Sequence, residues 1–262
     1  VLHWRKGKGL DSSPPTYQWG SKKVNAGFVT TFNELAVVSE NRITPIPKDF
    51  NLKLAPLFGC AVTTGLGVVI NNAELKIGES IVVIGAGGIG LNIIQGASMH
   101  SAYPIIAVDL FDHKLELAIK MGATHIINSK KQNIQDEINK IMIGKSLDVV
   151  VDNTGQSEII ELAYEMTDFQ GRVILVGVPQ KGKNISIYSL PLHFGKQLTG
   201  SHGGESAPHI DIPRYIRLYQ AGKLQLSELI TDYFPLSEIN VALDKMRSGE
   251  ISGRCLIEIS SP

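Results

Sequence analysis

The chain has 262 residues, of which 43% are hydrophobic and 19% are charged, and this composition is typical of a soluble globular protein with one or two domains. Its 25 basic and 25 acidic residues give a formal net charge of zero, which argues against binding to nucleic acid or to an anionic membrane. Its two cysteines lie far apart and form no disulfide framework, and no apolar run is long enough to span a bilayer. We therefore expect a cytoplasmic protein.

The first quarter of the chain has few regular patterns. Residues 5–20 are basic at first and then rich in Ser and Pro, which predicts an exposed loop. Residues 26–38 carry frequent apolar side chains and are predicted to form a strand. Residues 52–72 have apolar residues at helical spacing, interrupted by Gly59, Gly65 and Gly67. Glycines inside a helix indicate close approach by another backbone or by a ligand.

A strand followed by a glycine turn organises the centre of the sequence. Residues 81–84 are four consecutive Ile and Val residues, typical of a strand buried on both faces. Gly85, Gly87 and Gly90 then lead into a segment with helical spacing. In dinucleotide-binding turns the first glycine permits a tight turn, the second lets a pyrophosphate approach, and the third allows close helix packing. The helix N-terminus adds N–H groups and the positive end of its dipole, so the motif predicts nucleotide binding.

An acidic residue follows at the distance that such a motif requires. A second apolar run, residues 104–108, ends in Asp109, roughly 20 residues after Gly90. A carboxylate at this place accepts hydrogen bonds from the hydroxyl groups of the adenosine ribose and repels a 2′-phosphate. The sequence therefore favours NAD over NADP.

Strand-like and helical segments alternate through the rest of the central region. Helices are predicted from Asp112, near 134–142 and from Ser157, with strands at 125–127, 147–151, 171–178, 185–190 and 197–201. The tail differs, with helices beginning at Asp211 and Ser237 and extended segments at 231–236 and 254–259. The alternation predicts an α/β fold with a doubly wound parallel sheet at residues 61–203. This nucleotide-binding domain is inserted in a second domain, made of residues 1–60 and 204–262.

The segment Gly-Cys-Ala-Val-Thr-Thr-Gly-Leu-Gly at residues 59–67 resembles the signature that precedes the cofactor domain of zinc-dependent medium-chain alcohol dehydrogenases. Agreement continues through the glycine turn, Asp109, Lys114, 122–124, 176–178, 203–204 and 253–254. The resemblance implies a Rossmann domain inserted in a partial, mainly β, GroES-like catalytic domain. It also implies NAD and a catalytic zinc as cofactors, and a homodimer or homotetramer joined through the cofactor domains.

The resemblance also assigns roles to individual residues. Cys60 matches a ligand of the catalytic zinc, and Thr64 matches a residue that packs on the nicotinamide. Gly85, Gly87, Gly88, Ile89 and Gly90 match the pyrophosphate turn, with Asp109 and Lys114 at the adenosine ribose. The nicotinamide side is matched by Thr154, Val176, Val178, Ser201 and His202. Arg254 matches a pyrophosphate partner.

Two features depart from the family pattern. The family's remaining zinc ligands, a cysteine and a His-Glu motif, lie upstream of the position that Val1 matches, as does its proton relay. We therefore expect the 262 residues to lack the N-terminal part of the catalytic domain and to be inactive alone. A four-cysteine lobe that holds a structural zinc in many members is replaced by residues 8–20, which contain no cysteine. A structural zinc is not expected.

The expected function is hydride transfer between NAD(H) and an alcohol, aldehyde or ketone. One alternative is a zinc-free medium-chain reductase resembling quinone reductases, against which Cys60 in its signature argues. The other alternative is an NAD-binding fragment without catalysis. Considered without the family resemblance, Cys60 also fits a small buried hydrophobic residue, the commonest environment of a thiol outside disulfides.

Overall fold

The computed structural model describes residues 1–25 and 27–259. Its chain divides into two compact units, a terminal unit of Val1–Thr63 with Ser206–Pro262, and a central unit of Thr64–Glu205. The boundary between them falls inside helix α1 (Ala61–Gly67).

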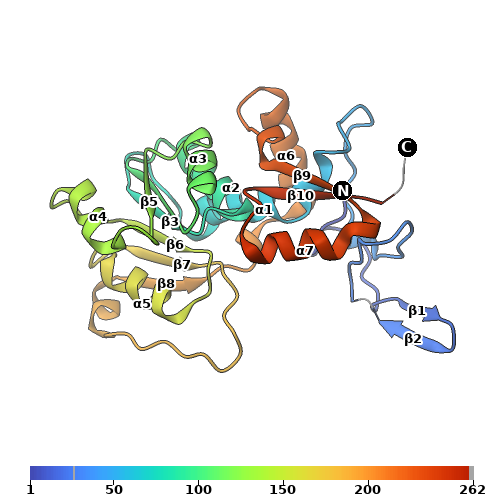
Figure 1. Ribbon diagram of the computed structural model, residues 1–262, viewed down its shortest axis with the longest axis horizontal. Helices are drawn as coiled ribbons and strands as arrows, with labels where there is room; N and C mark the ends of the chain where they lie inside the picture. The colour runs from blue at the N-terminus through green and yellow to red at the C-terminus, as the bar shows by residue number, and fades with distance from the viewer. Residues whose placement is uncertain (26, 260–262) are drawn as a thin grey trace. The chain divides into compact units, whose positions relative to one another are not determined.

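The central unit is built on a six-stranded parallel sheet in the order β5-β4-β3-β6-β7-β8 (Figure 1). The chain begins in the middle of this sheet, moves outward to one edge, returns to the middle and moves to the other edge. Its strands are β3 (Ile81–Ile84), β4 (Ile105–Asp109), β5 (His125–Asn128), β6 (Val149–Asp152), β7 (Arg172–Leu175) and β8 (Gln197–Gly200). This topology is that of dinucleotide-binding sheets, so the predicted fold class is confirmed.

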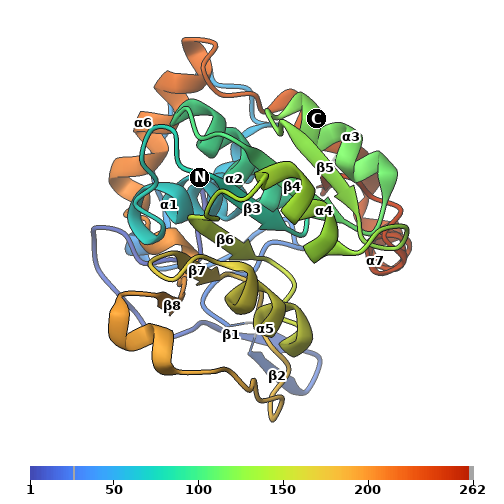
Figure 2. The same cartoon turned by 90° about the vertical axis from the view of Figure 1, so that its left-hand side faces the viewer.

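Helices cover both faces of the sheet (Figures 1 and 2). Helix α2 contacts β3 and β4, α3 contacts β4 and β5, and α5 contacts β6 and β7. Burial on both faces explains why the central strands are uninterrupted runs of Ile and Val. The helices are α2 (Gly88–Met99), α3 (Asp112–Lys120), α4 (Ile134–Met142) and α5 (Ser157–Met166).

Alternate residues of the strands form the core on one face. Val82, Ile84, Ile106 and Val108 pack with Val150 and Val173 beneath side chains of α4 and α5, which include Ile134, Ile138, Met142, Ala163 and Tyr164. The parallel register aligns the carboxyl ends of the strands, since Ile84 pairs with both Val108 and Asp152. The turns that follow the strands therefore gather along one edge of the sheet.

The terminal unit contains two small sheets. Strands β1 (Thr16–Trp19) and β2 (Lys22–Asn25) form an antiparallel hairpin, and β9 (Ile230–Pro235) pairs in parallel with β10 (Arg254–Glu258). Its helices are α6 (Pro208–Gln220) and α7 (Ile239–Ser248), the latter packed near β9. Phe234, Ala242 and Ile251 make a small core there.

Several sequence predictions of secondary structure are wrong. Residues 27–38 form no strand, and Ala26, where that strand was to begin, lies outside the described residues. The apolar side chains of this segment are exposed instead of paired, including Phe32 and Leu35. The predicted loop at 5–20 contains β1. The strand predicted at 185–190 is absent, because residues 185–189 are irregular and a 3-10 turn follows at Leu190–Phe194.

Helices α3 and α5 begin at Asp112 and Ser157, as predicted. Helix α6 begins at Pro208 instead of the predicted Asp211, so Pro213 lies inside it. The predicted helix at 52–72 is divided into a 3-10 turn (Ala55–Gly59), α1 and a π-helical turn (Val68–Asn72).

The glycines of this divided helix confirm the predicted close approaches. A Cβ atom placed on Gly67 would lie 2.3 Å from the Gly204 carbonyl oxygen, and one on Gly59 would lie 2.5 Å from the Leu2 carbonyl oxygen. Each is a backbone-to-backbone approach that only glycine permits. Asn71 strengthens the first of them by donating a hydrogen bond to the Gly204 carbonyl (2.7 Å).

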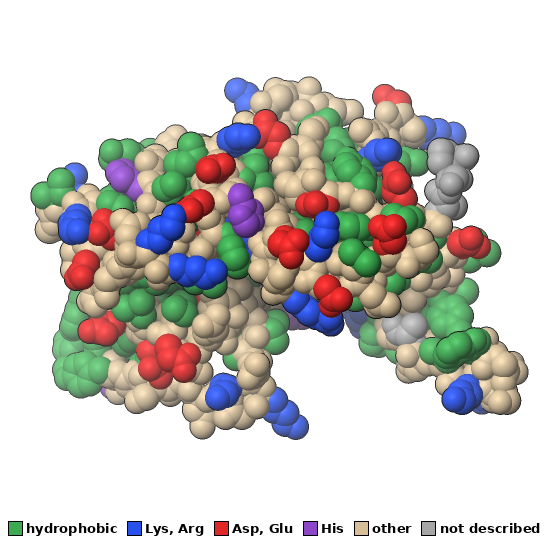
Figure 3. All heavy atoms as spheres, in the orientation of Figure 1, with side chains coloured by type: hydrophobic (Ala, Val, Ile, Leu, Met, Phe, Trp, Pro, Cys, Tyr) green, Lys and Arg blue, Asp and Glu red, His purple; other side chains and the backbone are tan. Residues whose placement is uncertain are grey.

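The charged surface is mixed. Acidic and basic side chains are interspersed on the face shown in Figure 3, in agreement with the zero formal charge. Within the described residues, no helix combines the length and the apolar character needed to cross a membrane.

Candidate functional site

The turn between β3 and α2 has the geometry that its glycines predict. Gly85 adopts φ +96°, and its N–H donates to the Val108 carbonyl (2.8 Å). A Cβ atom on Gly90 would lie 2.0 Å from the Gly85 carbonyl oxygen, so this position requires glycine for the helix to start so close to the strand. Helix α2 begins at Gly88 and continues through Ile89.

Gly87 differs from its neighbours because it faces open space. A Cβ atom there meets no atom within 4 Å, so packing does not require glycine at this position. Gly87 is the N-cap of α2, a helix of 12 residues, whose first N–H groups and positive dipole end favour an anion. An open surface at this point fits the pyrophosphate of a dinucleotide.

Asp109 connects the end of β4 to the glycine turn. Its Oδ2 accepts a hydrogen bond from the Ala86 N–H (2.8 Å), and its Oδ1 accepts from the N–H groups of Leu110 (2.7 Å) and Phe111 (3.2 Å). The carboxylate is only partly buried and has lone pairs left for a ligand. Lys114, one turn into α3, is half-buried, with its Nζ 5.0 Å from the centre of the Phe111 ring.

The turn after β6 is organised by a buried carboxylate. Asp152 is fully buried and accepts hydrogen bonds from the Thr154 N–H (2.9 Å), the Thr154 hydroxyl (2.7 Å) and the Gly155 N–H (2.9 Å). The Asn153 N–H donates to the Ile84 carbonyl (2.9 Å), which ties this turn to the glycine turn. Thr154 is thereby fixed at the point where the strand order reverses, the place where open α/β sheets bind ligands.

Sequence reasoning gave no role to Asp152 or Asn153. The available signal was an acidic residue at the carboxyl end of a buried strand, followed closely by a glycine. Such a residue commonly caps its own turn through short-range hydrogen bonds.

The carboxyl ends of β7 and β8 line an open pocket of about 390 Å³. Four predicted nicotinamide-side residues line it together: Val176, Val178, Ser201 and His202. Glu205, which sequence reasoning missed, fixes the wall by accepting a hydrogen bond from the His202 N–H (2.9 Å). Thr64 is buried in α1. A Cβ atom placed on Gly204 would lie 2.5 Å from the Thr64 carbonyl oxygen, so Thr64 lies beside the loop after β8.

The terminal unit holds the other two candidates. Cys60 precedes α1, and Arg254 is on β10, half-buried. The Nε atom of Arg254 is buried and makes no hydrogen bond within the described part of the chain. These two residues therefore belong to a different unit from the remaining candidates.

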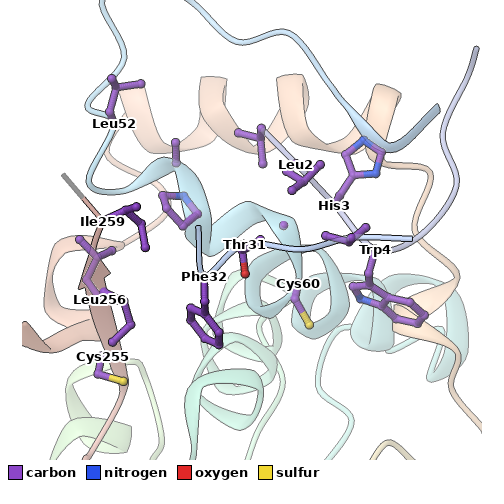
Figure 4. A pocket seen from close by; sticks show the side chains of 16 residues that line it. Leu2, His3, Trp4, Thr31, Phe32, Leu52, Cys60, Cys255, Leu256 and Ile259 are labelled. Carbon is purple, nitrogen blue, oxygen red and sulfur yellow. The ribbon is translucent and has the colours of Figure 1, made fainter. Parts of the chain in front are cut away.

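Cys60 lines a pocket of about 540 Å³ within the terminal unit (Figure 4). Most of its lining is apolar, including Leu2, Trp4, Phe32 and Leu256, and Cys255 of β10 also faces it. Burial raises the pKa of the Cys255 thiol, which disfavours the thiolate that binds metals. Within residues 1–25 and 27–259, no three His, Cys, Asp or Glu side chains form a group that can hold a metal ion. These residues alone do not fit a complete catalytic zinc site, which needs three protein ligands.

Comparison with known proteins gives consistent results. The family model described as zinc-binding dehydrogenase matches residues 88–221. The chain is 35% identical over 233 residues to alcohol dehydrogenase 1 of Trifolium repens, and 35% identical over 229 residues to S-(hydroxymethyl)glutathione dehydrogenase of Paracoccus denitrificans. These matches cover 88% and 84% of the chain but only 61% of each relative.

Solved structures show the same relation. The benzyl alcohol dehydrogenase of Acinetobacter calcoaceticus is similar to this chain with a TM-score of 0.79 and 34% identity, over 85% of this chain and 61% of that one. An alcohol dehydrogenase zinc-binding domain protein of Burkholderia ambifaria also has a TM-score of 0.79, with 30% identity over 86% and 60% of the two chains. The chain spans about three fifths of the relatives that it matches. It belongs to the zinc-binding dehydrogenase family, in agreement with its resemblance to the medium-chain alcohol dehydrogenases.

Proposed function

We propose that this chain is the cofactor-binding part of an NAD(H)-dependent oxidoreductase that interconverts an alcohol and its aldehyde or ketone. The observation that carries the proposal is the glycine turn. Gly87 faces open space at the start of α2, while Asp109 is bonded to the same turn. This arrangement fits a pyrophosphate and an adenosine ribose bound side by side.

The chain's own residues would bind and orient the dinucleotide. Gly87, Gly88 and Ile89 offer N–H groups to the pyrophosphate, and Asp109 with Lys114 fixes the ribose. Thr154, Val176, Val178 and the segment Ser201–His202 line the edge of the sheet further along, where the nicotinamide would lie. Bound NAD supplies the hydride-accepting ring, and the protein supplies placement and exclusion of water. Arg254 is proposed as a further pyrophosphate partner.

We further propose that Cys60 is one ligand of a catalytic zinc in the whole protein. Its remaining ligands would lie in the two fifths of the relatives' length that this chain does not cover. The apolar pocket beside Cys60 suits a small uncharged alcohol or carbonyl compound. A zinc-free reductase and a non-catalytic NAD-binding module are the alternatives, and the position of Cys60 in a pocket favours the zinc enzyme over both.

The free edge of the sheet supports a homodimer or homotetramer. Strand β8 is an edge strand, and the preceding segment exposes Leu190, Leu192 and Phe194 by 45%, 41% and 56%. Apolar residues gathered at an edge strand favour pairing with a second copy. We also propose a cytoplasmic location, since neither cysteine forms a disulfide.

Two measurements test the proposed function. Fluorescence titration with NADH should show saturable binding to the 262-residue chain. The version with its upstream polypeptide should oxidise simple alcohols with NAD and contain one catalytic zinc per chain. Absence of NADH binding would refute the cofactor assignment. Binding without turnover in the longer protein would favour the non-catalytic module, and turnover without zinc would favour the zinc-free reductase.

A further inference from the structure

The loop after β5 lies against the loop after β4, beside the candidate ribose site. The Ser129 N–H donates to the Asp109 carbonyl (3.0 Å), and the Asn128 side chain donates to Asp112 Oδ1 (2.6 Å). Asp109 and Asn128 are themselves paired in the sheet register. Residues of the second loop are thereby held close to the backbone of Asp109.

Phe111 brings two ammonium groups together at this place. The backbone N–H of Phe111 donates a hydrogen bond to Asp109 Oδ1, so this residue directly follows the turn that the carboxylate holds. The Lys130 Nζ lies 4.0 Å from the centre of the Phe111 ring, and the Lys114 Nζ lies 5.0 Å from it. Both distances are within the range of cation–π attraction, which holds flexible lysine side chains in place.

The neighbouring Lys131 is oriented differently. Its Nζ forms an ion pair with Asp112 Oδ2 at 2.5 Å. Hydrogen bonds from Lys131 and from Asn128 hold the pKa of the Asp112 carboxyl below its usual range, so the pair is ionised at neutral pH. The charge of Lys131 is therefore balanced locally, whereas Lys130 and Lys114 contribute positive charge around the ring of Phe111, two residues after Asp109.

We propose that Lys130, acting with Lys114 over the Phe111 ring, determines how strongly the site discriminates between NAD(H) and NADP(H). This inference rests on the proposed dinucleotide site. Asp109 repels a 2′-phosphate, and basic side chains near the ribose accommodate one. With both kinds of charge present, NADPH binds more weakly than NADH, but the difference is smaller than the carboxylate alone imposes. Lys130 is thus a specificity-determining residue that would reach the 2′-phosphate from the loop after β5, the strand next to β4.

The test compares NADH with NADPH on the 262-residue chain by fluorescence titration. Lys130→Ala should weaken NADPH binding at least about fivefold, since an ammonium a few ångströms from a phosphate contributes on the order of 1 kcal/mol or more. The same variant should change NADH binding by less than about twofold, because the 2′-hydroxyl carries no charge. Displacement by 2′,5′-ADP and by 5′-AMP should show the same contrast, which locates the effect at the adenosine half.

Two control variants remove one positive charge elsewhere. Lys120→Ala, at the far end of α3, should leave both affinities within about twofold of the unaltered chain. Lys131→Ala should have a smaller effect on NADPH than Lys130→Ala. Phe111→Leu, which keeps an apolar side chain but removes the ring that holds the ammonium groups, should weaken NADPH binding in the same direction as Lys130→Ala.

Three outcomes would overturn the inference. The first is an equal change in NADH and NADPH affinity on Lys130→Ala, and the second is no change in either. The third is an effect of Lys131→Ala as large as that of Lys130→Ala, which would indicate a general charge effect. All three leave the proposed function standing, because NADH still binds. If the unaltered chain binds neither NADH nor 5′-AMP, both the proposed function and this inference fail.

Discussion

The carboxyl edge of the central sheet and the thiol pocket of the terminal unit differ in how much of a site the chain itself provides. At the sheet edge, Asp109 is bonded to the glycine turn and Asn153 ties the next turn to β3. In the pocket, Cys60 and Cys255 are surrounded by apolar side chains, and no group of three metal-binding side chains forms anywhere in 1–25 or 27–259. A parallel sheet gathers its turns from one continuous stretch of chain, so that stretch alone positions the candidate residues of the central unit.

The terminal unit lacks such a framework. Its strands form two separate pairs, β1 with β2 and β9 with β10. Phe32, Leu35 and Val37 are 56%, 88% and 67% exposed, although a globular core normally buries such residues. This comparison predicts that cofactor binding and metal binding will respond differently to mutation.

The largest effect is expected at Cys60. In a protein of the relatives' full length, Cys60→Ala should remove the proposed zinc and lower turnover at least about 1000-fold, since such a metal supplies several kcal/mol of charge stabilisation. NADH affinity of the 262-residue chain should be unchanged. Elemental analysis after dialysis and steady-state kinetics measure the two effects.

Cys255→Ala is the matched control, because this thiol lines the same pocket but has a raised pKa. It should retain zinc and activity. The 262-residue chain alone should hold little zinc after dialysis. Full activity of Cys60→Ala would instead support the zinc-free reductase. A tightly bound zinc in the 262-residue chain would show that these residues contain further zinc ligands.

Gly87→Val should weaken NADH binding at least about 100-fold, because its side chain would occupy the open space at the start of α2. The melting temperature should change little, since a Cβ atom meets no neighbour there. Titration and circular dichroism measure the two quantities on the same sample.

Gly90→Val provides the contrast. Its Cβ atom would lie 2.0 Å from the Gly85 carbonyl oxygen, so the melting temperature should fall steeply. Normal NADH binding by Gly87→Val would show that the turn is purely structural, and the comparison between the two regions would lose its basis.

Asp109→Ser should shift the ratio of NADPH to NADH affinity about tenfold towards NADPH, since it removes both the acceptor for the ribose hydroxyls and the charge that repels a 2′-phosphate. Asp244→Ser is the control, because this exposed carboxylate lies on α7 of the terminal unit and pairs with Arg247 of the same helix. An unchanged ratio in Asp109→Ser would remove the carboxylate from the ribose site.

The smallest effect concerns the pH dependence of the terminal unit. His3 is 2% exposed, with Nδ1 2.7 Å from the Arg5 carbonyl oxygen and Nε2 2.9 Å from the Thr44 hydroxyl. Burial lowers the pKa of His3 from 6.5, so the unfolded chain binds a proton more readily than the folded one. The free energy of unfolding should therefore fall as the pH drops below about 6.5.

His3→Gln should reduce that dependence while NADH affinity stays constant. Chemical unfolding at several pH values between about 5 and 7.5 measures it. A slope that is the same with and without His3 would assign the titration to another group.

How much the sequence predicts also differs between the two regions. Strands such as β3 and β6 were predicted because burial on both faces leaves a continuous apolar pattern. The prediction of a strand at 26–38 was wrong. Apolar residues indicate a strand only where other parts of the protein cover them, whereas Phe32 and Leu35 are exposed. Glu205 and Asn153 escaped notice because their importance lies in hydrogen bonds across turns, which no local pattern reveals. The roles of the candidate site residues stay predictions.

The adjacency of β3 and β6 has a consequence for synthesis of the protein. These two strands form the middle of the sheet, yet the whole of α2, β4, α3, β5 and α4 is translated between them. Parallel strands so distant in sequence pair only after a long loop closes, which slows that step. A nascent chain that ends after Asn128 already contains the glycine turn and Asp109, but it lacks the strand on which that turn rests. Affinity for the adenosine half of the dinucleotide should therefore appear once Gly155 has left the ribosome, before β7 and β8 are made.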